Sequence, residues 1–220
     1  MCGKFTQMAS WRDVHAFSRP LVARVAGDTV QTATPMRFAF ILRLDEAGER
    51  IMVPMRWGFS RRSRAAPARP DHMHARAETV DQLPTFRDAF ARNRGLLLVH
   101  TFNEGEELPN GRTRQWVITP KDGEPVAIAV ICEASRQDEA PDWTFVQVTT
   151  PANALIAPLT DRMPAVLSRP AWPLWLGETG ASPAEAKALL TTFDDAGGWD
   201  IAPQNRRPGP KGRPQPDLFD

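Results

Sequence analysis

Short apolar runs separated by turn residues constrain the fold of this chain more than any other feature. RFAFILRL (37–44) and RIMVPMRW (50–57) flank the turn residues DEAGE, which predicts a strand pair. Three more apolar runs predict strands at GLLLVHTFNE (95–104), PVAIAVICEA (125–134) and WTFVQVTT (143–150). The Asn-Gly pair in ELPNGRTRQWVIT predicts a hairpin. Because no regular strand–helix–strand alternation is visible, the sequence predicts a strand-dominated α+β domain.

The predicted helices are few and short. Ser10 can cap the segment SWRDVHAF, and LPTFRDAFARN (83–93) has helical spacing. The segment SPAEAKALLTTF has the strongest helix start, with Ser182 as N-cap, Pro183 at the first helical position and Glu185 at the third.

We expect one domain over residues 1–205, because the sequence shows no internal repeat and no second core. The remaining segment, 206–220, is basic and proline-rich and lacks the apolar residues that a core requires, which predicts a flexible tail. A monomer is the default expectation.

Composition narrows the classes of function. No apolar run approaches the roughly 20 residues needed to span a bilayer, and MCGKFTQMAS lacks a signal-like apolar region, so a cytoplasmic location is expected. Cys2 and Cys132 are the only cysteines, which excludes a disulfide framework or a zinc ribbon, and Cys132 lies in an apolar run typical of the core. The histidines show no metal-ligand spacing. We expect no metal, no cofactor and no membrane contact.

Positive charge is concentrated although the net charge is only +1. Residues 56–76 contain one acidic residue, Asp71, and six arginines: Arg56, Arg61, Arg62, Arg64, Arg69 and Arg76. A second cluster lies in the tail at Arg206, Arg207, Lys211 and Arg213. Clustered guanidinium groups suit phosphate binding, and a solvated Arg- and Pro-rich loop is the alternative interpretation.

Cys2 directly follows Met1, so removal of the methionine would expose an α-amine and a thiol on adjacent carbons. An aldehyde can condense with the amine to an imine, and the thiol can then close a five-membered thiazolidine. The amine titrates near pKa ~8 and the thiol near ~8.5, so both are partly reactive at neutral pH. The alternative is a buried cysteine that stands at position 2 by chance.

Four segments together resemble one known family: MCGKFT, MRWGFS (55–60), HARAETV (74–80) and TTPANALIAPLTDRMPAVL (149–167). They are similar, in order, to the MCGRF, WGL, NARAET and TPAN…IHDRMP motifs of the SRAP family (SOS response-associated peptidase), and the similarity extends to about residue 203. The resemblance implies covalent capture of abasic sites in single-stranded DNA by the processed N-terminal cysteine. It also implies N-terminal autoprocessing, which would place the activity among the hydrolases (peptidases) or lyases.

The resemblance assigns roles to individual residues. Cys2 matches the nucleophile, and Glu104 in TFNEG matches the family's acid/base glutamate; a surface ion pair is the alternative for Glu104. Arginines that hold DNA phosphates are matched by Arg76 and Arg162, and Lys4 retains the positive charge of a family arginine. Trp57 offers a flat face either to the core or to a base.

Two departures bear on the chemistry. His74 replaces the asparagine of the family's NARAET block, which helps to hold the reacting sugar, and Thr160 replaces the histidine credited with acid/base help. In one interpretation His74 supplies the missing imidazole. In the other the chain is a paralogue whose crosslinking is slow, less reversible or absent.

The tail carries a separate signal. Gln215, Leu218 and Phe219 lie in QPDLF, which resembles the peptide that binds the bacterial sliding clamp, and an accidental match is the alternative. The sequence therefore predicts a nucleoid-associated protein that acts during replication and repair. Two other functions stay open: a non-covalent single-strand or junction-binding module, and a peptidase acting on peptides. A redox thiol is less favoured because no resolving cysteine stands near Cys2.

Overall fold

The computed structural model describes residues 4–9, 29–35, 37–59, 71–134, 143–194 and 196–204. Within them strands are the predominant regular element and the helices are few and short, which confirms the predicted strand-dominated α+β class. The strands are β1 (Lys4–Ala9), β2 (Thr29–Ala33), β3 (Phe38–Leu44), β4 (Arg50–Trp57), β5 (His74–Arg76), β6 (Arg94–Val99), β7 (Thr101–Glu107), β8 (Thr113–Pro120), β9 (Val126–Ala134), β10 (Trp143–Pro151), β11 (Arg162–Pro164) and β12 (Trp199–Pro203).

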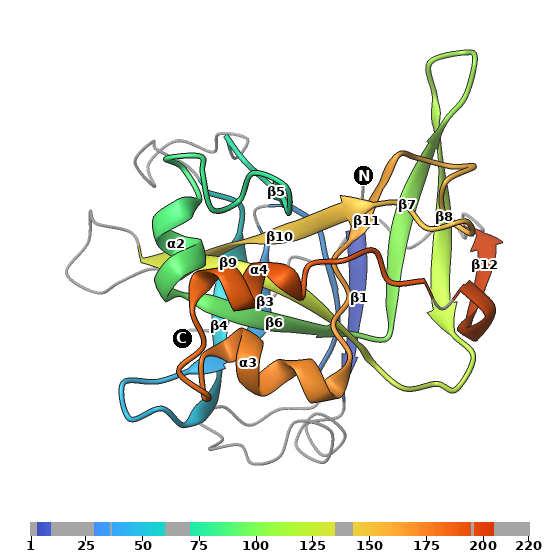
Figure 1. Ribbon diagram of the computed structural model, residues 1–220. Helices are drawn as coiled ribbons and strands as arrows, with labels where there is room; N and C mark the ends of the chain where they lie inside the picture. Colours follow the sequence, from blue (N-terminus) through green and yellow to red (C-terminus); the bar gives the residue numbers. More distant parts are fainter. Residues whose placement is uncertain are drawn as a thin grey trace, which may run out of the picture.

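The strands form two sheets. A five-stranded sheet has the order β12-β8-β7-β1-β2, and a seven-stranded sheet has the order β11-β10-β4-β3-β6-β9, with β5 paired to β10. Because β9 also pairs with β10, five strands of the larger sheet close into a ring. Figure 1 shows the helices beside the larger sheet and the β7–β8 hairpin projecting beyond the body of the domain.

Both faces of the larger sheet are covered, since alternate side chains of its strands enter two different clusters. The helix-side cluster takes Leu42 of β3 together with Phe90 and Trp175 from the helices. The sheet-side cluster takes Ile41, the residue before Leu42 in β3, together with Phe5 and Phe102 from the five-stranded sheet. This sheet-side cluster also contains Trp57, whose ring meets the predicted site residue His74.

The predicted strand 95–104 is in fact two strands. Residues 94–99 form β6 in the larger sheet, the chain bends at His100, and residues 101–107 form β7 in the smaller sheet. The sequence pattern did not show this change of sheet, because all of β6 is buried and residues 102–104 of β7 are buried as well. The predicted hairpin that follows is confirmed by the pairing of β7 with β8.

The helices are short: α2 (Arg87–Arg92), α3 (Trp172–Leu176) and α4 (Pro183–Ala188), with the 3-10 turns η1 (Arg169–Ala171) and η2 (Ala196–Gly198). The predicted start of α4 is confirmed, since Ser182 and Glu185 form a capping box. The helix stops before Phe193, which stacks on Trp199 at 5.1 Å in the sheet-side cluster. The helix predicted after Ser10 lies outside the described residues.

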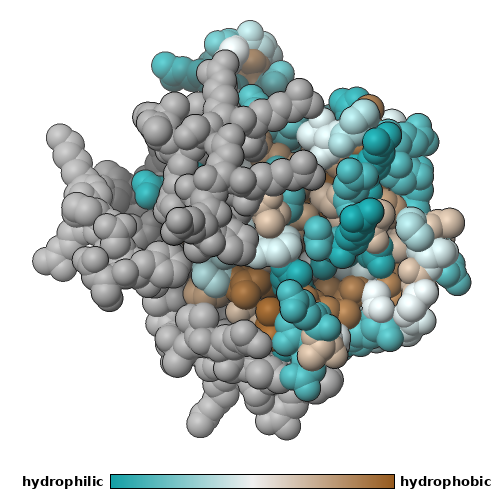
Figure 2. Space-filling model, turned by 90° about the vertical axis from the view of Figure 1, so that its left-hand side faces the viewer, coloured by the Kyte–Doolittle hydropathy of each residue, from teal (hydrophilic) through white to brown (hydrophobic). Residues whose placement is uncertain are grey.

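Figure 2 shows the described surface on the side of the molecule that lies to the left in Figure 1; it is largely polar, with a small apolar area near its lower centre. Among the described residues, Leu83 is the large apolar side chain that is exposed, at 44% of its surface. This side of the domain therefore offers no broad apolar surface in its described part.

Candidate functional site

Three neighbouring strands bring several predicted site residues together. β5 runs parallel to β10, with His74 opposite Gln147 and Arg76 opposite Thr149. β11 runs antiparallel to the same strand, with Arg162 opposite Pro151. The HARAET and DRMP blocks, far apart in the sequence, thus meet on the last residues of β10.

Arg162 is buried and held by two partners. Its guanidinium donates to both carboxylate oxygens of Glu78, with Nη1–Oε1 at 2.5 Å and Nη2–Oε2 at 2.8 Å. The same Nη2 donates to the backbone carbonyl of Thr149 at 2.6 Å. Hydrogen bonding from Arg162 lowers the pKa of Glu78 below its usual value, and the positive charge of Arg76 contributes to the shift. This arginine therefore fixes the turn after β5 against β10.

Lys187 of α4 holds the same turn from outside. Its Nζ donates to the backbone carbonyl of Glu78 at 3.1 Å and to Asp81 Oδ1 at 2.5 Å. A chain of contacts therefore runs from α4 through the turn to Arg162. Neither Lys187 nor Asp81 was singled out from the sequence, because each reads as an ordinary surface charge.

Arg76 and Arg162 differ in exposure. Arg76 is exposed between the buried Ala75 and Ala77, whereas only 8% of the surface of Arg162 is accessible. In this conformation Arg76 is available to a phosphate and Arg162 is engaged with Glu78 and Thr149. The phosphate contact predicted for Arg162 stays a prediction.

Trp57 lies in the core. Its side chain is completely buried, its Nε1 donates to the carbonyl of Met73 at 3.1 Å, and its ring packs on Phe5 at 5.1 Å and Phe145 at 6.2 Å. Of the two roles considered for Trp57, the structure shows the packing role, and the covered ring cannot stack on a DNA base in this conformation. The half-buried His74 meets the edge of this ring, with centroids 5.9 Å apart.

Glu104 is a fully buried carboxylate in β7. It lies two residues after Phe102 and therefore on the same face of the strand, toward the sheet-side cluster. The neighbouring acids differ from it. Glu106 accepts from Trp116 Nε1 at 2.9 Å and pairs with Arg114 at 3.5 Å, while Glu107 is exposed. Burial thus separates Glu104 from its neighbours, and its carboxylate is not at the protein surface.

Thr160 ends the turn that joins β10 to β11. Its hydroxyl donates to Asp161 Oδ1 at 3.5 Å, and its backbone N–H donates to Ile156 at 3.2 Å. The buried Asn153 organises this turn, accepting from the N–H of Ile156 at 3.1 Å and donating to the carbonyl of Phe193 at 3.0 Å. Asn153 of the TPAN block therefore has a structural function here.

Gln147 was not singled out from the sequence. It stands in β10 between Val146 and Val148, and its side chain is completely buried. Neither its amide nitrogen nor its amide oxygen has a hydrogen-bond partner among the described residues. The sequence did contain a signal for this residue, because a glutamine in the middle of the apolar run WTFVQVTT is unusual.

Cys132 packs in the sheet-side cluster, as expected. Burial raises the pKa of its thiol to about 12, so the group is protonated and unreactive at neutral pH. Cys2, the arginines at 61–69, and the tail residues Gln215, Leu218 and Phe219 lie outside the described residues.

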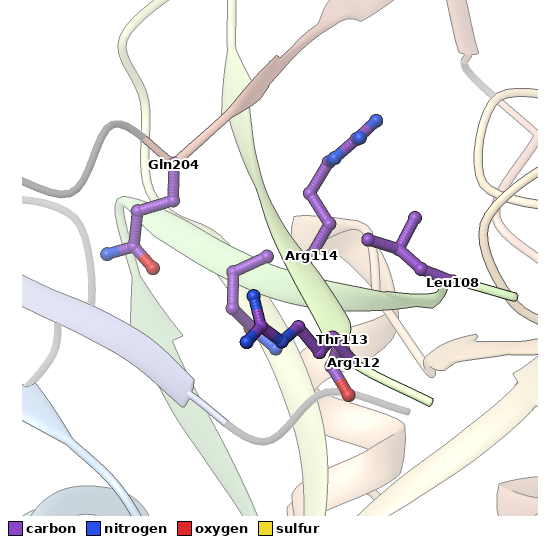
Figure 3. A pocket seen from close by; sticks show the side chains of 6 residues that line it. Leu108, Arg112, Thr113, Arg114 and Gln204 are labelled. Atoms are coloured by element: carbon purple, nitrogen blue, oxygen red, sulfur yellow. The ribbon is translucent and has the colours of Figure 1, made fainter. Parts of the chain in front are cut away.

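A cavity of about 620 Å³ lies along the β7–β8 hairpin, and its lining includes no residue of β5 or β11. Figure 3 shows Arg112, Arg114 and Gln204 around it, and the full lining is Leu108, Arg112, Thr113, Arg114, Gln115 and Gln204. It contains none of the residues predicted from the sequence. In the described part of the chain there is no group of three or more potential metal ligands. No described helix has the length and apolar character needed to cross a membrane.

The fold and these motifs define a class of protein: the chain belongs to the SOS response associated peptidase (SRAP) family, whose sequence pattern matches residues 1–203. Two Bacillus subtilis relatives, the abasic site processing proteins YoaM and YoqW, are each 28% identical to it over 123 residues. These matches cover 56% of this chain and about half of each relative (54% and 55%).

Solved structures share the fold. Crystal structures of a protein from Bordetella bronchiseptica and of one from Bacteroides thetaiotaomicron both superpose with a TM-score of 0.76 over 93% of this chain. They cover 100% and 92% of those proteins at identities of 18% and 20%, so the likeness concerns the fold alone.

Proposed function

We propose that this protein captures abasic sites in single-stranded DNA through the amine and thiol of Cys2 after removal of Met1. The observation that supports this most strongly is the position of Lys4. Lys4 begins β1 and is paired with Asn103, the residue before the buried Glu104. Two residues span at most about 7 Å, and paired antiparallel residues lie about 5 Å apart, so Cys2 is tethered within roughly 12 Å of this part of β7.

The chemistry balances without a cofactor. Hydrolysis of the Met1–Cys2 bond consumes one water and frees the α-amine. The amine adds to the aldehyde of the ring-opened abasic sugar, and loss of one water gives an imine. The thiol then adds across the C=N bond, its proton passing to nitrogen, and closes a thiazolidine.

Glu104 is the proposed acid/base. A carboxylate next to the reacting amine can accept its proton during addition and return a proton to the hydroxyl that leaves as water. Burial keeps bulk water away from such a group and strengthens its interaction with the developing positive charge. Among the acids of β7, Glu104 alone combines the family position with complete burial.

The surrounding residues have separate proposed roles. Arg76 is exposed at the end of β5 and binds a phosphate next to the lesion. Arg162 keeps β5 and β11 in place through Glu78 and approaches DNA when that pair opens. Lys4 adds positive charge at the start of β1. His74, on the rim of the sheet-side cluster, provides an imidazole in place of the family histidine at the position of Thr160. The protein is proposed to act in the cytoplasm on nucleoid DNA.

The test is a denaturing gel after incubation with single-stranded DNA that carries one abasic site. Wild-type protein is expected to give a DNA–protein species stable to SDS, and Cys2→Ala is expected to give no thiazolidine. Cys2→Ser keeps the amine and lacks the thiol, so its product should persist only after borohydride reduction. Intact mass must show loss of Met1 in all three proteins. Wild-type protein without a stable species contradicts the proposal.

Two alternatives have distinct results in the same assay. A non-covalent binding module, consistent with the replacements at His74 and Thr160, gives DNA binding that survives Cys2→Ala unchanged. A peptidase acting on peptides gives turnover of a peptide substrate that depends on Cys2, with no adduct on abasic DNA.

A further inference from the structure

Gln147 carries a polar group that the fold does not use. Its side chain is completely buried, and both atoms of its amide lack hydrogen-bond partners among the described residues. A buried amide without partners costs about 1–3 kcal/mol, and most such groups in folded proteins have a partner. An apolar residue at this place in β10 would avoid that cost. A ligand that hydrogen-bonds to the amide would explain why a glutamine stands there.

Strand pairing and side-chain alternation place Gln147 beside the proposed site. Gln147 lies directly opposite His74 in the parallel pair of β10 and β5. It lies two residues after Phe145 and on the same face of β10, toward the sheet-side cluster. Trp57 packs against His74 and Phe145, and also against Phe5 of β1.

Glu104 approaches the same cluster from β7. Phe5 is paired with Phe102, and Glu104 follows Phe102 on the same face. Gln147 and Glu104 are therefore polar groups on two strands that flank one aromatic centre at Trp57. Both are completely buried, and both lie on strand faces directed toward the sheet-side cluster.

We propose that the Gln147 amide binds the hydroxyl-bearing part of the abasic sugar. An amide presents an N–H donor and a carbonyl acceptor side by side, which suits a hydroxyl that accepts one hydrogen bond and donates another. The ring-opened abasic sugar has such a hydroxyl at C4′. This assignment rests on the proposed function, since it takes the abasic sugar as the ligand.

The test uses two oligonucleotides that cannot crosslink, so it does not depend on Cys2 chemistry. One carries a borohydride-reduced abasic site, which is ring-opened with hydroxyls at C1′ and C4′. The other carries a tetrahydrofuran analogue, which has neither hydroxyl. Wild-type protein is expected to bind the reduced site about fivefold to tenfold more tightly, as for one good hydrogen-bonded contact. Gln147→Met, which keeps the volume and removes the amide, is expected to abolish that preference.

Thermal unfolding supplies the second readout. Gln147→Met should unfold at the same or a higher temperature than wild type, because it removes a buried amide without a partner. Thr150→Val is the matched control. The Thr150 hydroxyl is also buried and has no hydrogen-bond partner in the described part of the chain, but it lies three residues along β10, on the opposite face. Thr150→Val should behave like Gln147→Met in unfolding and keep the full oligonucleotide preference.

Three results would overturn the assignment: equal wild-type affinity for the two oligonucleotides, a preference that survives Gln147→Met, or a lower unfolding temperature for that variant. The last result would show a structural amide, bonded for example to a buried water. Gln147→Leu repeats both measurements, and lowered unfolding temperatures in both variants would identify a structural amide. The proposed capture fails separately, when wild-type protein gives no adduct with a reactive abasic site.

Discussion

Arg162 and Glu78 form a two-pronged ion pair across the junction of β11 and the turn after β5, with oxygens 2.5 Å and 2.8 Å from the two terminal nitrogens. The arginine is 8% exposed, whereas about half of the Glu78 side chain is accessible. A buried guanidinium depends on this carboxylate for compensation, because burial of an uncompensated charge is unfavourable. The pair therefore links the stability of the fold to the geometry of the site.

Glu78→Gln is predicted to destabilise the fold by about 1 kcal/mol at neutral pH, because the amide leaves the Arg162 charge uncompensated and solvent screens the half-exposed carboxylate of the wild type. The pKa of Glu78 is lowered in the folded protein, so its contribution is present above the unfolded pKa, near ~4.3, and is lost as the pH falls through the folded value. Urea unfolding from pH 7 to pH 3 should show the wild type and the variant converging at the acid end. A constant difference across that range would contradict this.

Lys187→Met is predicted to weaken binding of abasic single-stranded DNA severalfold, because it frees the Glu78 turn from α4. Lys121→Met is the matched control: its Nζ also donates to a backbone carbonyl, that of Gly197 at 2.8 Å, and lies 3.9 Å from Asp200, far from the site in sequence and fold. Fluorescence anisotropy measures the DNA affinity of both variants, and only Lys187→Met is expected to lower it. Equal effects on DNA affinity would mean that Lys187 only supports overall stability.

Arg76→Ala is predicted to weaken DNA binding about equally for all sequences and to reduce the slope of log K against log salt by about 0.7, as for one phosphate contact to single-stranded DNA. Arg87→Ala serves as control, because Arg87 is also exposed and lies in α2 beside Asp88. Affinity titrations at several salt concentrations check this. An unchanged slope in Arg76→Ala would remove the phosphate assignment.

Glu104→Gln is predicted to slow adduct formation at least tenfold with little change in non-covalent DNA affinity, because general acid/base catalysis commonly contributes two or more orders of magnitude. Glu106→Gln is the neighbouring control and should keep the wild-type rate, since Glu106 is occupied by Trp116 and Arg114. Single-turnover gels measure both rates. Similar rates for Glu104→Gln and wild type would exclude the acid/base role.

The tail is predicted to bind the bacterial sliding clamp through Leu218 and Phe219, with Gln215 fixing the register. A labelled peptide of residues 206–220 should give a fluorescence polarisation increase with the clamp. Leu218→Ala together with Phe219→Ala should abolish that increase. Binding that persists in the double variant would identify a non-specific, charge-driven contact with the basic linker.

Pattern reasoning located most strands because alternation and turn residues are local signals. The capping box at Ser182 and the β7–β8 hairpin followed the same logic and are confirmed. The bend at His100 was not predicted, because an apolar run does not show which of the two sheets each half of it joins. The residues of α4 likewise gave no indication that Phe193 leaves the helix to stack on Trp199.

The site was less predictable than the fold. Motif resemblance selected Arg162 and Glu104, but it could not show that both are buried, since charged residues are usually exposed. The packed position of Trp57 depends on Phe5 and Phe145, which are distant in the sequence. Gln147 and Lys187 gain significance only from their neighbours in space.

Peptide mass spectrometry of the protein–DNA adduct tests the central claim most directly. After nuclease and protease digestion, the account predicts that the sugar remnant is on a peptide starting at Cys2. That peptide should have the mass of peptide plus sugar minus one water and a thiol that no longer reacts with iodoacetamide. A remnant on a lysine, or an adduct peptide that still contains Met1, would contradict the account.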